Sequence, residues 1–160
     1  MTIQETAAQV VHRLKDEGKH VALAESCTGG LLAKTITDVS GASDVFECGV
    51  VSYSSRIKAK VLGVNPEVIR QNSVVSEPVA VQMACGVRRL GDADIGVGIT
   101  GVAGPGPDGN HPEGEIFVAV TDGKTDKVTH LMTGTENARA ENRETAAQCA
   151  LNMILDLLHR

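Results

Sequence analysis

The 160-residue sequence has almost no aromatic side chains, with one Tyr, two Phe and no Trp. Proteins that bind single-stranded nucleic acid stack bases on such rings, so the sequence disfavours this class. An excess of basic residues is also missing, because 15 Lys and Arg stand against 20 Asp and Glu, for a formal net charge of −5. Nucleic-acid surfaces need clustered positive charge. We therefore expect a small-molecule partner and no nucleic acid.

Close pairs of cysteine are missing too. The four cysteines lie at positions 27, 48, 85 and 149, a spacing that suggests neither a zinc site nor a disulfide scaffold. No apolar run approaches the roughly 20 residues that span a bilayer, and the N-terminus lacks a basic segment followed by an apolar core. We expect a cytoplasmic protein with reduced thiols and no membrane contact.

What the sequence does contain is typical of one globular domain over residues 1–160, with 42% hydrophobic and 22% charged residues. The periodicity predicts strands at 21–24, 46–53, 93–100, 115–121 and 127–132, helices at 3–17, 30–38, 57–62, 76–91 and 137–158, and a short helix starting at Pro66. The last two strands form a hairpin around Asp122-Gly123. The predicted fold class is α/β, a layered α/β/α sandwich with a mixed, mostly parallel sheet.

The chain is organised around AESCTGG at 24–30, where an apolar strand ends at Ser26 just before an amphipathic helix. The start of a helix presents unpaired N–H groups and partial positive charge, which suit an anion or a developing oxyanion beside a serine. The alternative is that Ser26 or Thr28 only caps the helix. We expect Thr28 to cap, with Gly29 and Gly30 in the turn.

A serine nucleophile needs a base. The five histidines lie in segments that look exposed or terminal, which leaves lysine, and Lys58 is the candidate. A base role requires burial that disfavours the ammonium form, whereas most lysines are solvated. Ser55 is a rival nucleophile because Ser55 and Lys58 form an S-x-x-K arrangement. Cys27 is expected to pack rather than react, because neighbours on an extended chain point in opposite directions.

A second glycine-rich loop, at 101–109, follows the strand at 93–100. Loops at the carboxyl ends of parallel strands gather on one rim of the sheet. We therefore expect the turn at Ser26, the segment 53–58 and this loop to share a cleft.

Four blocks carry a family resemblance: AESCTGG at 24–30, VSYSSRIK at 51–58 with LGV at 62–64, VVSE at 74–77, and TGVAGP at 100–105. They closely resemble the CinA C-terminal domain family, come in the family's order, and together are specific. The family's extra N-terminal domain is not seen, so the chain looks like the stand-alone nicotinamide mononucleotide deamidases. The resemblance implies hydrolysis of nicotinamide mononucleotide to nicotinic acid mononucleotide and ammonia in pyridine nucleotide recycling.

By this resemblance Ser26 attacks the amide carbon and Lys58 takes its proton. Tyr53 and Thr28 orient the pair, and N–H groups near residues 28–30 hold the oxyanion. The implied substrate-binding residues are Gly29, Gly30, Ser54, Thr100, Gly101, Gly104, Arg139 and Arg143. Neither a metal nor a cofactor is required.

The substrate's phosphate has two possible sites, the N–H groups of residues 101–106 or the arginines of the last helix. Arg139 and Arg143 lie four residues apart, on one helix face. The alternative is that they only pair with Glu136, Glu141 or Glu144 on a solvated helix.

Two segments depart from the family's pattern. Ser55 stands where the family has Asn, and HPEGE at 111–115 stands where it has Lys-Pro-Val-Gly-Thr. These departures keep two alternatives open: a related amidohydrolase with a shifted substrate, and a non-catalytic nucleotide-binding module of the same fold. A homodimer or higher homo-oligomer is expected, as for many small α/β domains.

Overall fold

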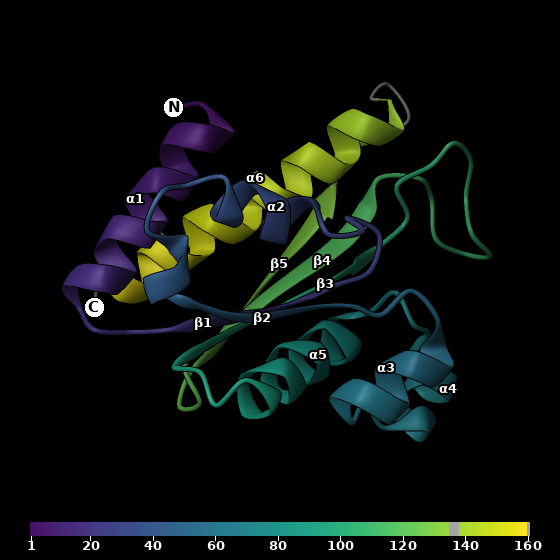
Figure 1. Ribbon diagram of the computed structural model, residues 1–160. Coiled ribbons are helices and arrows are strands. Elements are labelled where there is room, and N and C mark those ends of the chain that lie inside the picture. The colour runs from purple at the N-terminus through teal and green to yellow at the C-terminus, as the bar shows by residue number, and fades with distance from the viewer. Residues whose placement is uncertain (135–137, 160) are drawn as a thin grey trace.

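The computed structural model describes residues 1–134 and 138–159 and has three layers (Figure 1). Its helices are α1 (Ile3–Asp16), α2 (Leu31–Thr37), α3 (Ser55–Leu62), α4 (Pro66–Asn72), α5 (Glu77–Leu90) and α6 (Arg139–Leu158), with a 3₁₀ turn η1 (Ala42–Asp44). Its strands are β1 (Val21–Glu25), β2 (Phe46–Val51), β3 (Ile95–Gly101), β4 (Glu115–Thr121) and β5 (Asp126–Met132).

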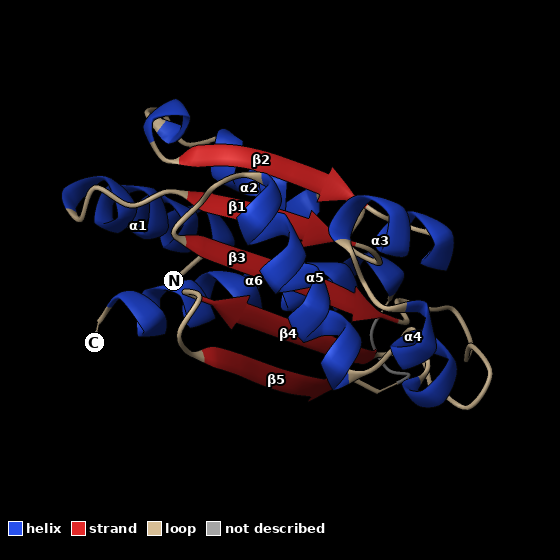
Figure 2. Ribbon diagram, turned by 90° about the horizontal axis from the view of Figure 1, so that it is seen from below, coloured by secondary structure: helices blue, strands red, loops and turns tan. Residues whose placement is uncertain are grey.

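One sheet forms the middle layer, in the order β2-β1-β3-β4-β5 (Figure 2). Strand β1 pairs in parallel with β2 and β3, whereas β4 is antiparallel to both β3 and β5. All described strands except β4 therefore run in one direction. Helices α1, α2 and α6 cover one face and α3, α4 and α5 the other (Figure 1). The predicted α/β/α sandwich with a mixed, mostly parallel sheet is confirmed.

The predicted elements are present, with small differences at their ends. Strand β2 ends at Val51, two residues before the predicted end, because Ser54 already caps α3: its Oγ accepts a hydrogen bond from the Ile57 N–H at 3.2 Å. The last helix is described from Arg139 onward, and Asn137, its predicted start, lies outside the described residues.

Strand β1 shows how the two apolar faces are built. Val21 and Leu23 pack with the helices α1 and α6, while Ala22 and Ala24 pack with α5. Successive side chains of a strand point to opposite faces, so this five-residue strand is buried on both sides. The small alanines match the close approach of α5 to the sheet.

Register places the functional segments side by side. Glu25, the last residue of β1, lies opposite Val51 at the end of β2 and opposite Ile99 near the end of β3. Because these strands are parallel, the segments that follow them leave the same edge of the sheet. Strand β4 starts at this edge as well, since its Ile116 pairs with Gly101.

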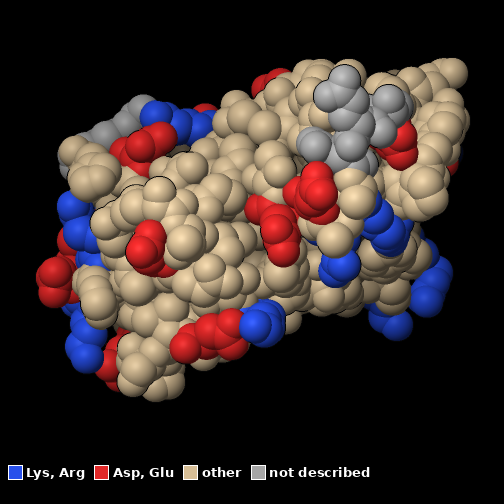
Figure 3. Space-filling view, turned by 90° about the horizontal axis from the view of Figure 1, so that it is seen from above, with Lys and Arg blue, Asp and Glu red and all other residues tan. Residues whose placement is uncertain are grey.

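The outer surface carries charges of both signs. Seen from above, over the layer of α1, α2 and α6, acidic and basic side chains are interspersed (Figure 3). Within residues 1–134 and 138–159, every helix is either too short or too polar to cross a membrane.

Candidate active site

A cleft of about 300 Å³ opens at the edge where β1, β2 and β3 end. Each of the three segments expected to converge contributes to its walls, which are lined by Ser26, Cys27, Tyr53, Ser55, Lys58, Val74, Val75, Asp108 and Arg139, together with residues 100–107 of the glycine-rich loop. The predicted convergence is confirmed. It follows from the parallel pairing of the strands, which brings together residues 26, 53 and 101 despite their separation in sequence.

Ser26 and Lys58 meet in this cleft. Ser26 follows β1 directly, and Lys58 lies on α3 with only 1% of its surface exposed. The Lys58 Nζ donates hydrogen bonds to the Ser26 Oγ at 2.9 Å and to the Ser52 carbonyl oxygen at 2.6 Å. The predicted proximity of the two side chains is confirmed, whereas their catalytic role stays a prediction.

Burial shifts the pKa values of Lys58 and Cys27 in opposite directions. It lowers the pKa of Lys58 from 10.5 to about 8, although the nearby Cys27 acts in the opposite direction. Roughly a tenth of Lys58 is then the neutral amine at pH 7. Burial also raises the pKa of the Cys27 thiol to about 11, so the sulfur stays protonated near neutrality. This pattern makes Lys58 a usable base and Cys27 an unreactive packing group.

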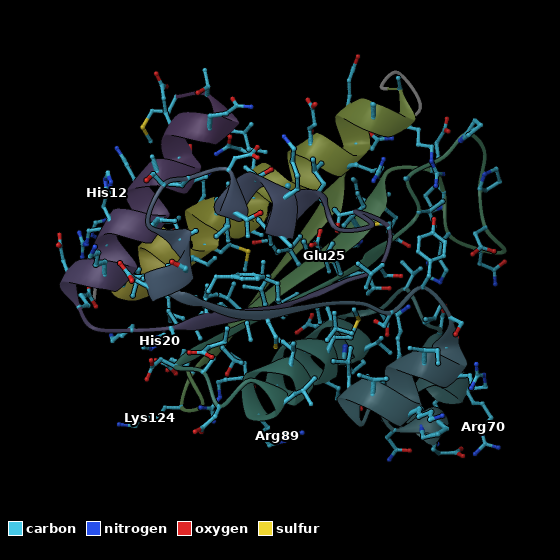
Figure 4. All side chains as sticks on the ribbon, in the orientation of Figure 1. His12, His20, Glu25, Arg70, Arg89 and Lys124 are labelled. Atoms are coloured by element: carbon cyan, nitrogen blue, oxygen red, sulfur yellow. The ribbon has the colours of Figure 1, made fainter. Side chains whose placement is uncertain are left out.

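Glu25 is a buried residue that the sequence analysis did not single out. Only 1% of it is exposed, and it lies between the sheet and α2 (Figure 4). Its carboxylate accepts hydrogen bonds from the N–H groups of Leu32 at 2.9 Å and Ala33 at 3.0 Å. These two N–H groups lie just beyond residues 28–30, where the open donors were predicted, and they are already occupied. An acidic residue just before a helix was the available signal, because it complements the helix dipole.

The turn between β1 and α2 also differs from the prediction. Gly30, in the left-handed region at φ 102°, is the residue before α2 and has no side chain to cap it. The Thr28 Oγ1 has no hydrogen-bond partner among the described residues, so the predicted cap by Thr28 is wrong. Gly29, at φ 60°, donates its N–H to the Ser26 carbonyl at 3.0 Å. In the described part of the chain, the N–H groups of Cys27, Thr28 and Gly30 have no partner. Of these three residues, Cys27 lines the cleft.

Two buried hydroxyls near the pair lack hydrogen-bond partners within residues 1–134 and 138–159. They are the Thr28 Oγ1 and the Ser52 Oγ, and both residues are fully buried. Thr28 thus bonds neither Ser26 nor Lys58, and the orienting role expected of it has no contact to support it.

Arg139 joins two walls of the cleft. Its Nη2 donates to the Tyr53 hydroxyl at 3.1 Å, and its Nη1 donates to the Gly104 carbonyl. Tyr53 is 62% exposed and, among the described residues, has no hydrogen bond to Ser26 or Lys58. Its phenol bonds Arg139 at the cleft, and its role in orienting the pair stays a prediction.

Arg143 has a different position from Arg139. Its Nε donates to the Cys27 carbonyl at 3.1 Å and its Nη2 to the Thr28 carbonyl at 2.7 Å, so it supports the turn that carries Ser26. Arg143 does not line the cleft. The two arginines therefore do not face the cleft together, as a shared phosphate site would require. Among the described residues, the two arginines bond Gly104, Tyr53, Cys27 and Thr28 and pair with none of the acids of α6. Glu136 lies outside the described residues.

The glycine-rich loop is fixed from both ends. Thr100 is buried and donates its Oγ1 proton to the Val74 carbonyl at 2.9 Å, while a Cβ on Gly101 would lie 2.6 Å from the Ile116 Cγ1. The Gly106 N–H donates to Glu113 Oε2 at 2.7 Å. That donor was expected to be open for a phosphate, and a carboxylate of the chain itself occupies it.

Comparison with known proteins settles the family. The profile of the CinA C-terminal domain matches residues 3–158. The chain belongs to the CinA C-terminal domain family. A CinA-like protein of Anaeromyxobacter sp. is 48% identical over 94% of this chain, but that match covers 37% of its own length. A CinA-like protein of Chlorobium limicola is 40% identical over 94% of this chain, and that match covers 35% of its own length. The CinA-family chain thus spans about a third of these relatives.

Two further comparisons cover most of both compared chains. The nicotinamide-nucleotide amidohydrolase PncC of Escherichia coli is 39% identical over 91% of this CinA-family chain and 88% of its own length. The crystal structure of the competence/damage inducible protein CihA from Agrobacterium tumefaciens superposes with a TM-score of 0.93 at 33% identity, over 99% of this chain and 96% of that one.

Ser55, the rival nucleophile of the CinA-family chain, is the first residue of α3 and lines the cleft. Lys58 donates to Ser26 and Ser52, however, and within the described residues Ser55 has no hydrogen bond to it. The contacts favour Ser26 as the partner of the lysine.

Residues 111–115, which differ from the family's pattern, contain part of a hydrogen-bonded cluster of side chains that the sequence did not predict. His111 contacts the Glu115 Oε1 through Nδ1 and lies 2.8 Å from the Ser73 Oγ through Nε2. The Nε2 of His130 lies 2.9 Å from the Glu115 Oε2, and its ring stacks on Phe117. The prediction that these histidines are merely exposed is wrong for His111, because 23% of its side chain is exposed.

Proposed function

We propose that the chain is an amidohydrolase that converts nicotinamide mononucleotide to nicotinic acid mononucleotide and ammonia. Ser26 is the nucleophile and Lys58 the base. The observation that carries the proposal is the 2.9 Å hydrogen bond from a buried lysine with a lowered pKa to a serine hydroxyl in a cleft. The similarity to the amidohydrolase of Escherichia coli supports this substrate class.

The first half of the reaction forms an acyl-enzyme. The neutral amine of Lys58 accepts the hydroxyl proton of Ser26 while the Oγ bonds to the carboxamide carbon. The Ser52 carbonyl fixes the Nζ by accepting another of its protons. The unpaired N–H groups of Cys27 and Thr28 are the donors for the negative oxygen of the tetrahedral intermediate.

The second half releases the products. The C–N bond breaks as the Lys58 ammonium returns its proton to the leaving nitrogen, and ammonia departs. Water then attacks the acyl carbon, Lys58 takes a proton from it, and the bond to Ser26 breaks to give the carboxylate and a free hydroxyl.

Arg139 is the proposed phosphate ligand. It lines the cleft, and a guanidinium has five N–H donors, of which its bonds to Tyr53 and Gly104 use two. The Gly106 N–H is a poorer choice, because Glu113 already holds it.

The direct test measures ammonia released from nicotinamide mononucleotide. Ser26→Ala and Lys58→Met should each lower kcat by roughly 10³-fold or more, since both groups act on the reacting atoms. The matched control is Lys60→Met, an exposed lysine on the same helix, which should leave kcat unchanged. Activity that survives in Ser26→Ala would contradict the mechanism, and saturable binding without turnover in the unmodified protein would identify a non-catalytic nucleotide-binding module.

A second candidate is an amidohydrolase for a nicotinamide compound without a phosphate. Glu113 favours it, because its carboxylate brings negative charge to the Gly106 N–H of the glycine-rich loop. The ratio of kcat/KM for nicotinamide mononucleotide to that for nicotinamide riboside decides between the candidates. A ratio above 1 supports the nucleotide, and one below 1 supports the shifted substrate.

A further inference from the structure

Ser73, His111 and Glu115 form a second array of reactive side chains, and none of the three lines the cleft that contains Ser26. Ser73 directly follows α4, His111 lies in the loop after β3, and Glu115 begins β4. The imidazole lies between the other two groups, with Nε2 at 2.8 Å from the Ser73 Oγ and Nδ1 against the Glu115 Oε1. A serine, a histidine and a carboxylate in this order constitute the arrangement of a hydrolytic triad.

The neighbouring hydrogen bonds suit proton transfer from Ser73 to His111. The Val75 N–H donates to the Ser73 Oγ at 3.3 Å, which leaves the hydroxyl proton available for the His111 Nε2 at 2.8 Å. Burial opposes ionisation of Glu115, but hydrogen bonds from His111 and His130 outweigh it and hold the pKa of the carboxyl below its ordinary value. An ionised carboxylate only accepts, so the Nδ1 of His111 carries the ring proton. This is the tautomer that a general base requires.

The backbone around Ser73 supplies two further features. Ser73 has φ 74° and ψ 157°, a conformation that residues other than glycine rarely adopt. The N–H of Val74 has no hydrogen bond within the described part of the chain. In hydrolases with a serine on a sharp turn, the N–H of the residue after the nucleophile is a donor to the oxyanion. Val74 is placed to offer that donor.

We propose that Ser73, His111 and Glu115 form a second nucleophilic centre, which hydrolyses small acyl esters. The Ser73 Oγ bonds to the acyl carbon, its proton passes to the His111 Nε2, and the ester C–O bond breaks as that proton reaches the departing alcohol. Water then bonds to the acyl carbon, His111 takes a proton from it, and the bond to Ser73 breaks with return of that proton. Glu115 is a positioning residue that holds the imidazole.

The substrate class follows from the partial exposure of the array. Ser73 is half-buried, and 23% of the His111 side chain and 13% of the Glu115 side chain are exposed. The array is therefore partly open to solvent and lies outside the cleft, so we assign it small acyl esters, which need no enclosed pocket.

The test uses the full chain with Ser26→Ala, so that labelling of the first serine cannot interfere. An alkyl fluorophosphonate is added, and the phosphonylated peptide is identified by mass spectrometry, since bond formation at the Ser73 Oγ releases fluoride and a proton. We expect labelling of Ser73, slowed at least about 100-fold by His111→Gln. The matched control, His12→Gln, changes an exposed histidine and should leave the rate unchanged.

Two more variants separate chemistry from folding. Ser73→Gly removes the hydroxyl but suits φ 74°, so labelling should disappear while the thermal midpoint stays equal or rises. Glu115→Gln keeps the shape of the side chain and should slow labelling at least about 10-fold in protein that unfolds cooperatively. An unlabelled Ser73 in folded protein, or a rate that His111→Gln does not change, overturns the proposal. Neither result depends on whether nicotinamide mononucleotide is a substrate.

Discussion

The ammonium of Lys58 is the group whose protonation should govern the rate. Its pKa is about 8, and the neutral form is the one that can accept the proton of Ser26. We therefore predict that kcat/KM for nicotinamide mononucleotide rises about tenfold between pH 7 and pH 8.5 and then levels off. The substrate's phosphate titrates near pH 6 and does not disturb this window. Initial rates of ammonia release from pH 7 to 10 check the prediction.

A rate that is flat or falls across this range would show that Lys58 acts as an acid or only as a structural group. The unfolding midpoint, measured over the same range, is the control that separates titration of the base from loss of the fold.

At the scale of single elements, the start of α2 depends on Glu25. Its carboxylate accepts from the N–H groups of Leu32 and Ala33, and an amide at this position offers only one acceptor oxygen and no charge. We predict that Glu25→Gln lowers the free energy of unfolding by about 2 kcal/mol, measured by urea denaturation. The matched control is Glu5→Gln, in the exposed capping box of α1, with an expected loss of about 0.5 kcal/mol or less. Equal losses for the two variants would contradict the structural role of Glu25.

The contact between β3 and α5 depends on glycine. A Cβ on Gly98 would lie 2.3 Å from the Ala80 carbonyl oxygen and 2.7 Å from the Ala84 nitrogen, so the helix would have to move. We predict that Gly98→Ala lowers the free energy of unfolding by about 3 kcal/mol. Gly49→Ala on the edge strand β2 is the control, because its nearest neighbours are side chains at 3.2 and 3.3 Å. Its expected loss is about 1 kcal/mol, and the same loss at Gly98 would count against close packing of α5.

At the scale of the whole molecule, α6 reaches the site with two arginines that have different tasks. Arg139 lines the cleft beside Tyr53, whereas Arg143 holds the carbonyls of Cys27 and Thr28. We predict that Arg139→Ala raises KM for nicotinamide mononucleotide about tenfold, with a small effect on kcat. Arg143→Ala should lower kcat about tenfold with a small effect on KM, because it loosens the turn that carries Ser26. Steady-state kinetics of ammonia release measure both.

If Arg143→Ala raised KM and Arg139→Ala lowered kcat instead, Arg143 would be the residue that binds the substrate. Nicotinamide riboside has no phosphate. If Arg139→Ala raised KM for it as much as for nicotinamide mononucleotide, Arg139 would not bind the phosphate.

The sequence by itself determined the order of the elements, the α/β layers and the convergence of three loops. These follow from local periodicity, from turn residues such as Asp122 and Gly123, and from the geometry of parallel strands. Ser26 was predictable because it directly follows a strand. Lys58, in the first turn of α3, was predictable because the histidines were set aside as bases and because the family resemblance includes it.

Only the tertiary structure decided which donors are open and which are occupied. Glu25 fills the start of α2, Glu113 holds the Gly106 N–H, and His111 lies between Ser73 and Glu115. A hydrogen bond depends on distances within a few tenths of an ångström between groups that are far apart in sequence or separated by a turn. Sequence patterns give the side of an element on which a residue lies, and the packing of the whole chain sets its partner.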